Sequence, residues 1–146
     1  MAGEEYGKIA REWYDYVNKG ELDRAFALLH RDVEVLDVSQ GQLMRGAEAT
    51  RPWMQDWHTA FPDSSVEIQD LIETGDRLVV EFIARGTHSG PLAGPGGQIP
   101  PTGKRIELRG CDVFHFKDGK IYRRHMYYDG ATMLRQLGLL SQERAA

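Results

Sequence analysis

The amino-acid sequence predicts an α+β domain whose helices gather on one face of an antiparallel sheet. Apolar residues recur at helical spacing through most of the first 60 positions. From residue 66 to residue 129 the pattern changes to the alternation that is typical of strands. Two dipeptides that favour tight turns, Gly75-Asp76 and Asp118-Gly119, divide this second part into two pairs of strands. Such a sheet buries one face against the helices, which is the α+β arrangement.

Two helices and a strand are expected in the first part of the chain. Apolar residues from Tyr6 to Val17 share one helical face, and most charged residues between them lie on other faces. Gly20 interrupts this pattern, and a second short helix is expected over about residues 22–29. The segment Val33–Val38 alternates in the manner of a strand.

A third helix and four longer strands should follow. The helix is expected over about residues 47–60, with Pro52 within its first two turns, where proline removes a backbone donor. The period-two pattern then continues almost to the end of the chain. The strands are expected at about residues 66–74, 77–86, 104–117 and 120–129.

The segment 88–103 separates the two pairs of strands and contains four prolines and five glycines. This composition predicts a loop without regular structure, placed over the mouth of a pocket. A last helix is expected over about residues 131–137, because Gly138 follows the apolar pattern as a C-terminal cap would. If the sheet curves around the helices, the space between them is a cone-shaped pocket.

Composition is that of an ordinary globular protein and predicts a single domain over residues 1–146. The chain has 18 basic and 22 acidic residues and a net charge of −4. It has one cysteine, Cys111, so it can form neither an internal disulfide nor a cysteine-cluster metal site.

No apolar run approaches the roughly 20 residues of a membrane helix. The acidic N-terminus does not resemble a signal peptide, so we expect a cytoplasmic protein. Basic residues are scattered, which argues against nucleic-acid binding.

Several short motifs occur in a consistent order along the chain. They are Ala60-Phe61-Pro62-Asp63, Gly75-Asp76-Arg77-Leu78-Val79, Arg85-Gly86-Thr87-His88-Ser89-Gly90, Ile99-Pro100-Pro101-Thr102-Gly103-Lys104, Asp118-Gly119-Lys120-Ile121, Asp129 and Gln136-Leu137-Gly138-Leu139. With these motifs and this order of elements, the chain resembles the SnoaL-like polyketide (ester) cyclases of the NTF2-like superfamily. The resemblance spans about residues 6–140 and implies a cone-shaped barrel, in which a curved antiparallel sheet wraps around the N-terminal helices.

The resemblance also implies an activity without a cofactor. Family members with known activity close a ring in an aromatic polyketide by intramolecular aldol condensation, and a carboxylate near the end of the last strand acts as general acid and base. By position this carboxylate corresponds to Asp129. Many relatives have tryptophan where this chain has His125, which predicts a different pocket shape or a different route for protons. The glycine-rich stretch 94–98 suggests an altered lid.

The hairpin around Asp118-Gly119 allows a prediction of which side chains share a face. A two-residue turn pairs Lys117 with Lys120 and sets Asp112 opposite His125. A three-residue turn would shift the register by one residue and break that pair. Because residues two apart share a face, the expected pocket face carries Asp112, Phe114, Phe116, Ile121, His125, Tyr127 and Asp129.

Asp129 is the leading candidate for the general base, because an apolar pocket would raise the pKa of its carboxyl toward the working pH. The alternative is that Asp129 caps the helix that begins near Ala131. His125 is the second catalytic candidate, since it could orient Asp129 or stabilise an enolate. Its alternative is a packed histidine paired with Asp112, a residue better suited to orienting a partner than to acting directly.

Six further residues are candidates for contact with a substrate. His88 lies where a pocket mouth is expected and could bind a carbonyl, or else anchor the loop. Tyr127 could donate to an enolate oxygen or line the wall. The aromatic residues Trp13, Trp57 and Phe114 would form apolar walls or plain core. The predicted substrate-binding set is His88, Asp112, Tyr127, Phe114, Trp57 and Trp13.

These observations favour a cofactor-independent enzyme that removes a proton next to a carbonyl, as a cyclase or a related isomerase. A hydrolase or hydratase using the same pocket is a weaker alternative, because Thr87, His88 and Met126 stand where related epoxide hydrolases have other residues. A non-catalytic binding protein for a hydrophobic small molecule remains an alternative. We expect no metal, because no histidine pair has ligand spacing. A homodimer or a higher homo-oligomer is expected through the outer sheet face, with Arg109, Val113, Tyr122 and Met126.

Overall fold

The structure is a computed structural model that describes residues 3–94 and 96–140. The helices are α1 (Gly3–Asn18), α2 (Leu22–Phe26), α3 (Ala47–Ala60) and α4 (Gly130–Gln136). The strands are β1 (Leu29–Asp37), β2 (Gln42–Arg45), β3 (Ser65–Thr74), β4 (Arg77–Thr87), β5 (Leu92–Gly94), β6 (Gly97–Ile99), β7 (Arg105–Lys117) and β8 (Lys120–Tyr128). The predicted α+β class is confirmed, and every predicted helix and strand forms. Two bounds differ from the prediction: α2 ends at Phe26 instead of about residue 29, and β1 begins at Leu29 instead of Val33.

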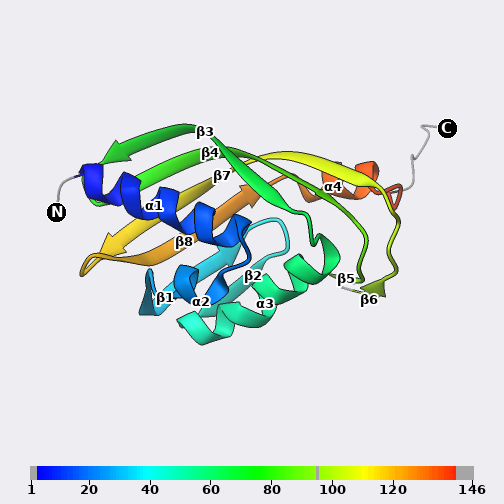
Figure 1. The fold of residues 1–146 in the computed structure, drawn as a ribbon, viewed down its shortest axis with the longest axis horizontal. Coiled ribbons are helices and arrows are strands. Elements are labelled where there is room, and N and C mark those ends of the chain that lie inside the picture. Colours follow the sequence, from blue (N-terminus) through cyan, green and yellow to red (C-terminus); the bar gives the residue numbers. More distant parts are fainter. Residues whose placement is uncertain (1–2, 95, 141–146) are drawn as a thin grey trace.

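Six strands make one curved sheet in the order β2-β1-β8-β7-β4-β3. Helices α1, α2 and α3 lie along one face of this sheet, so the sheet is concave toward them (Figure 1). All neighbouring strands run antiparallel except β1 and β8, which run parallel. Among the residues that are described, no helix is long and apolar enough to cross a bilayer.

Three short strands and one pairing were not expected. Strand β2 has four residues, of which only Met44 is buried, so it carries almost no alternating signal. Strands β5 and β6 form a separate two-stranded hairpin within the proline- and glycine-rich segment, and the prediction of no regular structure there is wrong in part. Strand β1 was expected, but its parallel pairing with β8 depends on contacts between distant parts of the chain.

The β7–β8 hairpin turns as predicted and then departs from the predicted register. Asp118 and Gly119 adopt φ angles of 54° and 74°, and Lys117 pairs with Lys120. After the pair Phe116 and Ile121, the next pair is His115 and Arg123, which leaves Tyr122 as an extra residue, a β-bulge. Beyond this bulge the side chains of β8 point to the opposite face from the predicted one.

Two buried clusters fill the space between the helices and the sheet. The larger lies under α1 and α2 and includes Trp13, Tyr14 and Phe114. The smaller lies under α4 and includes Phe61 and Leu92. The amide of Gln136 fixes α4 to β7, accepting from the N–H of Glu107 at 2.8 Å and donating to its C=O at 3.0 Å.

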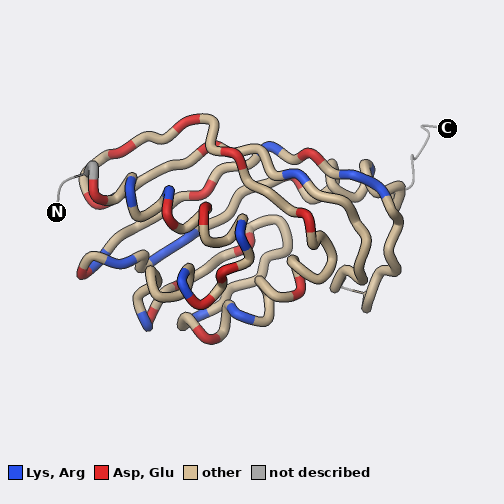
Figure 2. The backbone as a smooth tube through the Cα atoms, in the orientation of Figure 1, with Lys and Arg blue, Asp and Glu red and all other residues tan. Residues whose placement is uncertain are grey.

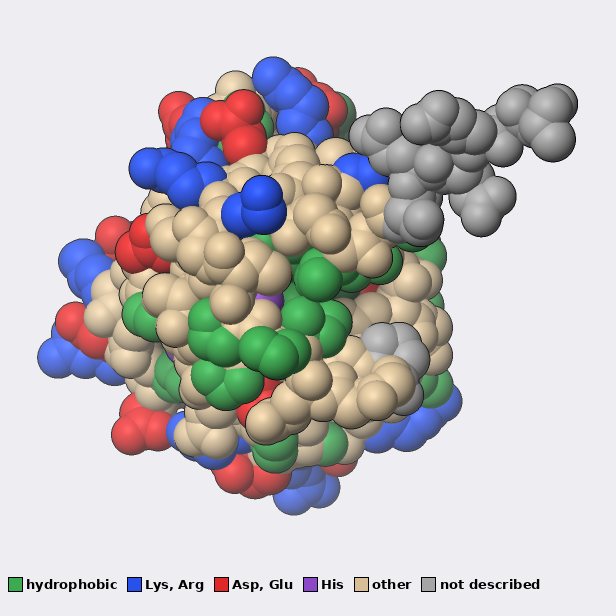
Figure 3. Space-filling view, turned by 90° about the vertical axis from the view of Figure 1, so that its right-hand side faces the viewer, with side chains coloured by type: hydrophobic (Ala, Val, Ile, Leu, Met, Phe, Trp, Pro, Cys, Tyr) green, Lys and Arg blue, Asp and Glu red, His purple; other side chains and the backbone are tan. Residues whose placement is uncertain are grey.

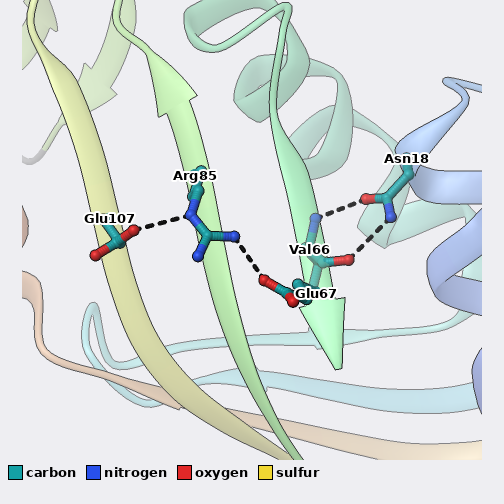
Figure 4. Close-up of polar contacts among 5 residues, drawn as sticks. All are labelled: Asn18, Val66, Glu67, Arg85 and Glu107. Carbon is teal, nitrogen blue, oxygen red and sulfur yellow. Dashed lines mark hydrogen bonds and ion pairs between the residues drawn. The ribbon is translucent and has the colours of Figure 1, made fainter. Parts of the chain in front are cut away.

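A similar amide contact covers the sheet edge at β3. The side chain of Asn18 accepts from the N–H of Val66 at 2.8 Å and donates to its C=O at 2.9 Å (Figure 4). Arg85 on the adjoining strand β4 forms hydrogen bonds of 2.8 Å with Glu67 on β3 and with Glu107 on β7 (Figure 4). Acidic residues recur along β3 (Figure 2). Charged side chains and a covered backbone reduce the tendency of an edge strand to pair with another chain.

Gly90 is the glycine whose replacement should damage the fold most. A Cβ atom there would lie 1.9 Å from the backbone oxygen of Thr59, at the end of α3. We expect Gly90→Ala to lower the free energy of unfolding by about 1–3 kcal/mol, measured by urea denaturation, because the backbone must move to admit the methyl group. Gly96→Ala is the matched control, since no atom lies within 4 Å of its Cβ position. Equal stability of the two variants would contradict this reading of the contact.

Candidate active site

A small, mostly apolar cavity lies between the helices and the concave face of the sheet. All three tryptophans of the chain line it, Trp13 from α1 and Trp53 and Trp57 from α3. Aliphatic and other apolar side chains from the sheet complete most of the wall. The cavity volume is about 80 Å³, enough for two or three water molecules. The polar side chains in its wall are Tyr14, Asp112, Arg124 and Tyr128.

Asp112 is the central polar group of the cavity. It lies on β7 with an exposed fraction of 0%. Its Oδ2 accepts a hydrogen bond from the hydroxyl of Tyr14 at 2.5 Å, and from Nε and Nη2 of Arg124 at 3.2 and 3.1 Å. Its Oδ1 is buried and has no hydrogen-bond partner among the described residues. One carboxylate oxygen is therefore held in place while the other is free to take a proton.

Tyr14 and Arg124 stabilise this buried carboxylate, because a charge away from water needs a partner. Burial, reinforced by the neighbouring charge of Asp112, raises the pKa of the Tyr14 hydroxyl well above its usual value. Tyr14 therefore stays protonated and donates. The guanidinium of Arg124 packs on the face of Trp13, with its Cζ 5.2 Å from the ring centroid, and this contact fixes its direction.

A second tyrosine and carboxylate pair lies at another part of the wall. Tyr128 lines the cavity, and its hydroxyl donates to Oδ2 of the fully buried Asp37 at 2.9 Å. Oδ1 of Asp37 accepts the backbone N–H of Gln40 at 3.1 Å. Burial is the main cause that raises the pKa of Tyr128 far above its usual value, so this hydroxyl also remains a donor.

A wider groove adjoins the cavity and shares two of its lining residues. Trp53 and Trp57 line both spaces, and the groove continues over α3 to the turn at Gln40 and to β5. Its volume is about 540 Å³, within the range of small-molecule sites. At the end of the molecule that carries α4 and the β5–β6 hairpin, hydrophobic side chains gather in the middle of the face (Figure 3). The cavity and the groove therefore meet at Trp53 and Trp57.

The bulge at Tyr122 removes two expected residues from the cavity. His125 pairs with Val113 rather than with Asp112, and its Nε2 lies 2.9 Å from Oε2 of Glu34 on the outer face. The hydrogen bond with His125 is the main cause that lowers the pKa of Glu34. Tyr127 also points outward and is 43% exposed. The predictions that His125 pairs with Asp112, and that His125 and Tyr127 face the pocket, are wrong.

The same shift brings inward two residues that were expected outside. Arg124 reaches Asp112, and Met126 pairs with Asp112 and lines the cavity. Met126 is 3% exposed, so it cannot form part of the outer surface that was expected to join copies of the chain. The oligomeric state itself stays a prediction.

Asp129 stands at the N-cap of α4 and not in an apolar pocket. Its Oδ1 accepts from the backbone N–H groups of Ala131 and Thr132 at 3.0 and 3.2 Å, and its Oδ2 accepts from the Thr132 hydroxyl at 2.7 Å. Its side chain is 63% exposed. The hydrogen bonds from Thr132 are the first causes that lower the pKa of Asp129. The expected burial and raised pKa are therefore wrong, and the alternative of a helix cap matches the geometry.

His88 anchors the loop at the end of β4. The ring is fully buried beside Phe61, and its Nδ1 accepts from the N–H of Thr102 at 3.2 Å. Burial lowers the pKa of His88, so the ring is neutral near pH 7 and carries its proton on Nε2. His88 packs beside the smaller cluster and is not among the residues that line the cavity. Its expected place at the pocket is wrong, and loop anchoring is the observed role.

Of the other expected residues, Trp13, Trp57 and Asp112 line the cavity. Phe114 is on the predicted face but packs within the larger cluster, edge-on to Tyr14. Tyr14 was not among the predicted residues, although Ala10, Tyr14 and Val17 form a buried helical stripe that could have indicated it. No sequence signal indicated Arg124, because its direction depends on the bulge.

No group of three or more histidine, cysteine, aspartate or glutamate side chains in the described part of the chain is arranged to hold a metal ion.

Comparison with known proteins identifies the relatives of this chain. The family of SnoaL-like polyketide cyclases matches residues 8–137. The chain is similar to IdmH from Streptomyces antibioticus, a candidate polyketide cyclase, with 29% identity and a TM-score of 0.76 over 90% of this chain and 97% of that one.

Two other solved structures share the fold at lower identity. A candidate SnoaL-like polyketide cyclase from Jannaschia sp. CCS1 has 17% identity and a TM-score of 0.84, over 95% of each chain. AclR from Streptomyces galilaeus, a candidate hydroxylase, has 20% identity and a TM-score of 0.83, over 98% of this chain and 91% of that one. No curated protein matches the chain.

Substitution of Asp129 should reveal a capping role. We expect Asp129→Ala to lower the melting temperature at pH 7, whereas Asp129→Asn should keep most of the stability because asparagine also caps helices. The pKa of Asp129 is lowered in the folded state, so its charged form stabilises the fold above the unfolded pKa of about 4 and this contribution is lost as the pH falls through the folded pKa. Thermal unfolding between about pH 7 and pH 3.5 should therefore show the difference between wild type and Asp129→Ala shrinking in acid. A difference that grows in acid would contradict this assignment.

Proposed function

The chain belongs to the SnoaL-like polyketide cyclase family, and from this premise we propose that it is a cofactor-independent cyclase. It would remove a proton next to a carbonyl and close a ring by intramolecular aldol addition. Its substrate would be a polyketide ester or a similar hydrophobic carbonyl compound. The observation that carries the proposal is the free Oδ1 of Asp112, a buried atom of a residue that lines a mostly apolar cavity. A carboxylate in such surroundings suits general base catalysis.

The proposed reaction needs only one proton carrier. Oδ1 of Asp112 takes the proton from the carbon next to a carbonyl, and the electrons of the C–H bond move to the carbonyl oxygen to give an enolate. The enolate carbon then attacks a second carbonyl of the same molecule and forms the new C–C bond. The alkoxide that results takes the proton back from Asp112, so the carboxylate is regenerated and no electron acceptor is required.

The neighbours of Asp112 support this role. Tyr14 and Arg124 bind only Oδ2, so they orient the carboxylate without blocking Oδ1. Apolar walls exclude water, which strengthens the electrostatic interactions within the cavity. The cavity of about 80 Å³ suits the reacting carbonyl group, and the groove of about 540 Å³ suits the fused rings of an aromatic polyketide. Trp53 and Trp57, which line both spaces, could stack on such rings.

Hydrogen–deuterium exchange at carbon should test the proposal. We expect wild type in D₂O to catalyse exchange at the activated carbon of aromatic β-keto esters or anthraquinone-type polyketide esters, followed by NMR or mass spectrometry. Asp112→Asn should lower this rate by roughly 10²–10⁴-fold, the usual contribution of a general base.

Asp129→Asn is the matched control, because it makes the same chemical change in an exposed carboxylate and should keep the exchange activity. Circular dichroism and ligand binding should confirm that Asp112→Asn is folded. Loss of exchange in Asp129→Asn with retention in Asp112→Asn would reverse the assignment of the base. Tight binding of these compounds without exchange by wild type would favour the binding-protein alternative.

A further inference from the structure

The indole N–H of Trp13 is a second unpartnered polar group at the cavity. Trp13 lies on α1, is 2% exposed and lines the same cavity as Asp112. Its ring is stacked with Phe26, at a centroid distance of 6.4 Å, and its face also carries the guanidinium of Arg124. The Nε1 atom is buried and has no hydrogen-bond partner among the described residues.

A buried tryptophan N–H usually finds a partner, because leaving it without one is unfavourable. The tyrosine hydroxyls and the guanidinium of the wall have partners within the protein. The hydroxyl of Tyr14 and two nitrogens of Arg124 donate to Asp112, and the hydroxyl of Tyr128 donates to Asp37. Among the fully buried polar side-chain atoms of the wall, two have no partner in the described part of the chain: one acceptor, Oδ1 of Asp112, and one donor, Nε1 of Trp13.

We propose that the Trp13 indole N–H donates a hydrogen bond to the substrate carbonyl oxygen whose neighbouring carbon is deprotonated by Asp112. This inference rests on the proposed function and assigns the group that stabilises the enolate oxygen. Enolisation needs an acceptor for the proton at carbon and a donor for the oxygen on which the negative charge develops. The cavity supplies one of each. Arg124 links the two, because its guanidinium contacts both Asp112 and the face of Trp13.

The position of Arg124 strengthens the proposed donor. A positive charge on the face of an aromatic ring draws electron density from the ring, which makes the N–H a better donor. With the substrate oxygen bound at Nε1 of Trp13, the same charge would also lie on the side of the cavity where the enolate forms. Tyr14 is not available for this role while it donates to Asp112, and its raised pKa keeps its proton in place. Trp13 is thus proposed as a catalytic residue that acts at oxygen while Asp112 acts at carbon.

Trp13→Phe tests the proposal, because phenylalanine keeps an apolar ring but lacks the donor. We expect kcat for carbon exchange to fall by roughly 10²–10³-fold, the effect of removing one donor to a developing oxyanion, with little change in KM. Trp53→Phe is the comparison, since Trp53 lines the groove as well as the cavity and its substitution should raise KM more than it lowers kcat. An unchanged kcat in folded Trp13→Phe would overturn the assignment.

A second measurement does not require turnover. With ¹⁵N labelling, the three tryptophans give three indole N–H resonances, and the one lost in Trp13→Phe identifies Trp13. On titration with 2-naphthol, a flat ring whose hydroxyl can donate to Asp112 and accept from Trp13, we expect that resonance to move downfield. Naphthalene has no oxygen and is the control for effects of the ring alone.

The outcomes separate this inference from the proposed function. If wild type shows exchange that depends on Asp112 but the Trp13 resonance responds equally to 2-naphthol and naphthalene, the donor assignment fails and the cyclase proposal stands. If no carbonyl compound exchanges but 2-naphthol shifts the Trp13 resonance, the donor is supported as a ligand-binding group and the cyclase proposal fails. Failure of 2-naphthol to bind would overturn the donor assignment.

Discussion

The buried contact between Asp112 and Arg124 ties together the parts of the molecule on which the site depends. Asp112 belongs to β7, Arg124 to β8, and the third partner, Tyr14, to α1. A buried ion pair is seldom a net source of stability, because both charges lose water, but removal of one partner leaves the other charge stranded. The carboxylate therefore fixes how α1 sits on the sheet. It also keeps one of its own oxygens directed away from both partners.

This contact exists because β8 contains one residue more than β7 opposite it. Turn dipeptides and alternation predicted both strands and their hairpin, and the pairing holds from Lys117–Lys120 to Phe116–Ile121. A bulge cannot be recognised from the alternation of residue types when the strand carries aromatic and charged side chains on both faces, as β8 does. One extra residue, Tyr122, moves His125 out of the cavity and Arg124 into it. The faces of β7, the strand opposite the bulge, were predicted correctly from the same alternation, because the extra residue lies on β8.

The motifs that carried the family resemblance are mostly structural in this protein. Asp129 caps α4, Gln136 fixes α4 to β7, and Thr102 holds the ring of His88. Each of these contacts joins a side chain to the backbone or to a loop, where only a few residue types can fulfil the geometry. Such positions are readily recognised in a sequence and indicate the fold well. The cavity wall is made instead of residues such as Trp13 and Tyr14, whose helical spacing is equally typical of an ordinary core.

The residues proposed to carry out the chemistry and the residues proposed to bind the substrate's rings belong to different elements. Asp112, Tyr14, Trp13 and Arg124 come from β7, α1 and β8, which also contribute side chains to the larger buried cluster. The groove comes from α3, the β1–β2 turn and β5, and β5 belongs to a short hairpin outside the main sheet. Loops and short hairpins tolerate substitution better than a packed sheet does. Substitutions in the groove could therefore change the substrate without disturbing the carboxylate and the indole N–H. The enolate unit that these two groups would bind is the same in every activated carbonyl compound.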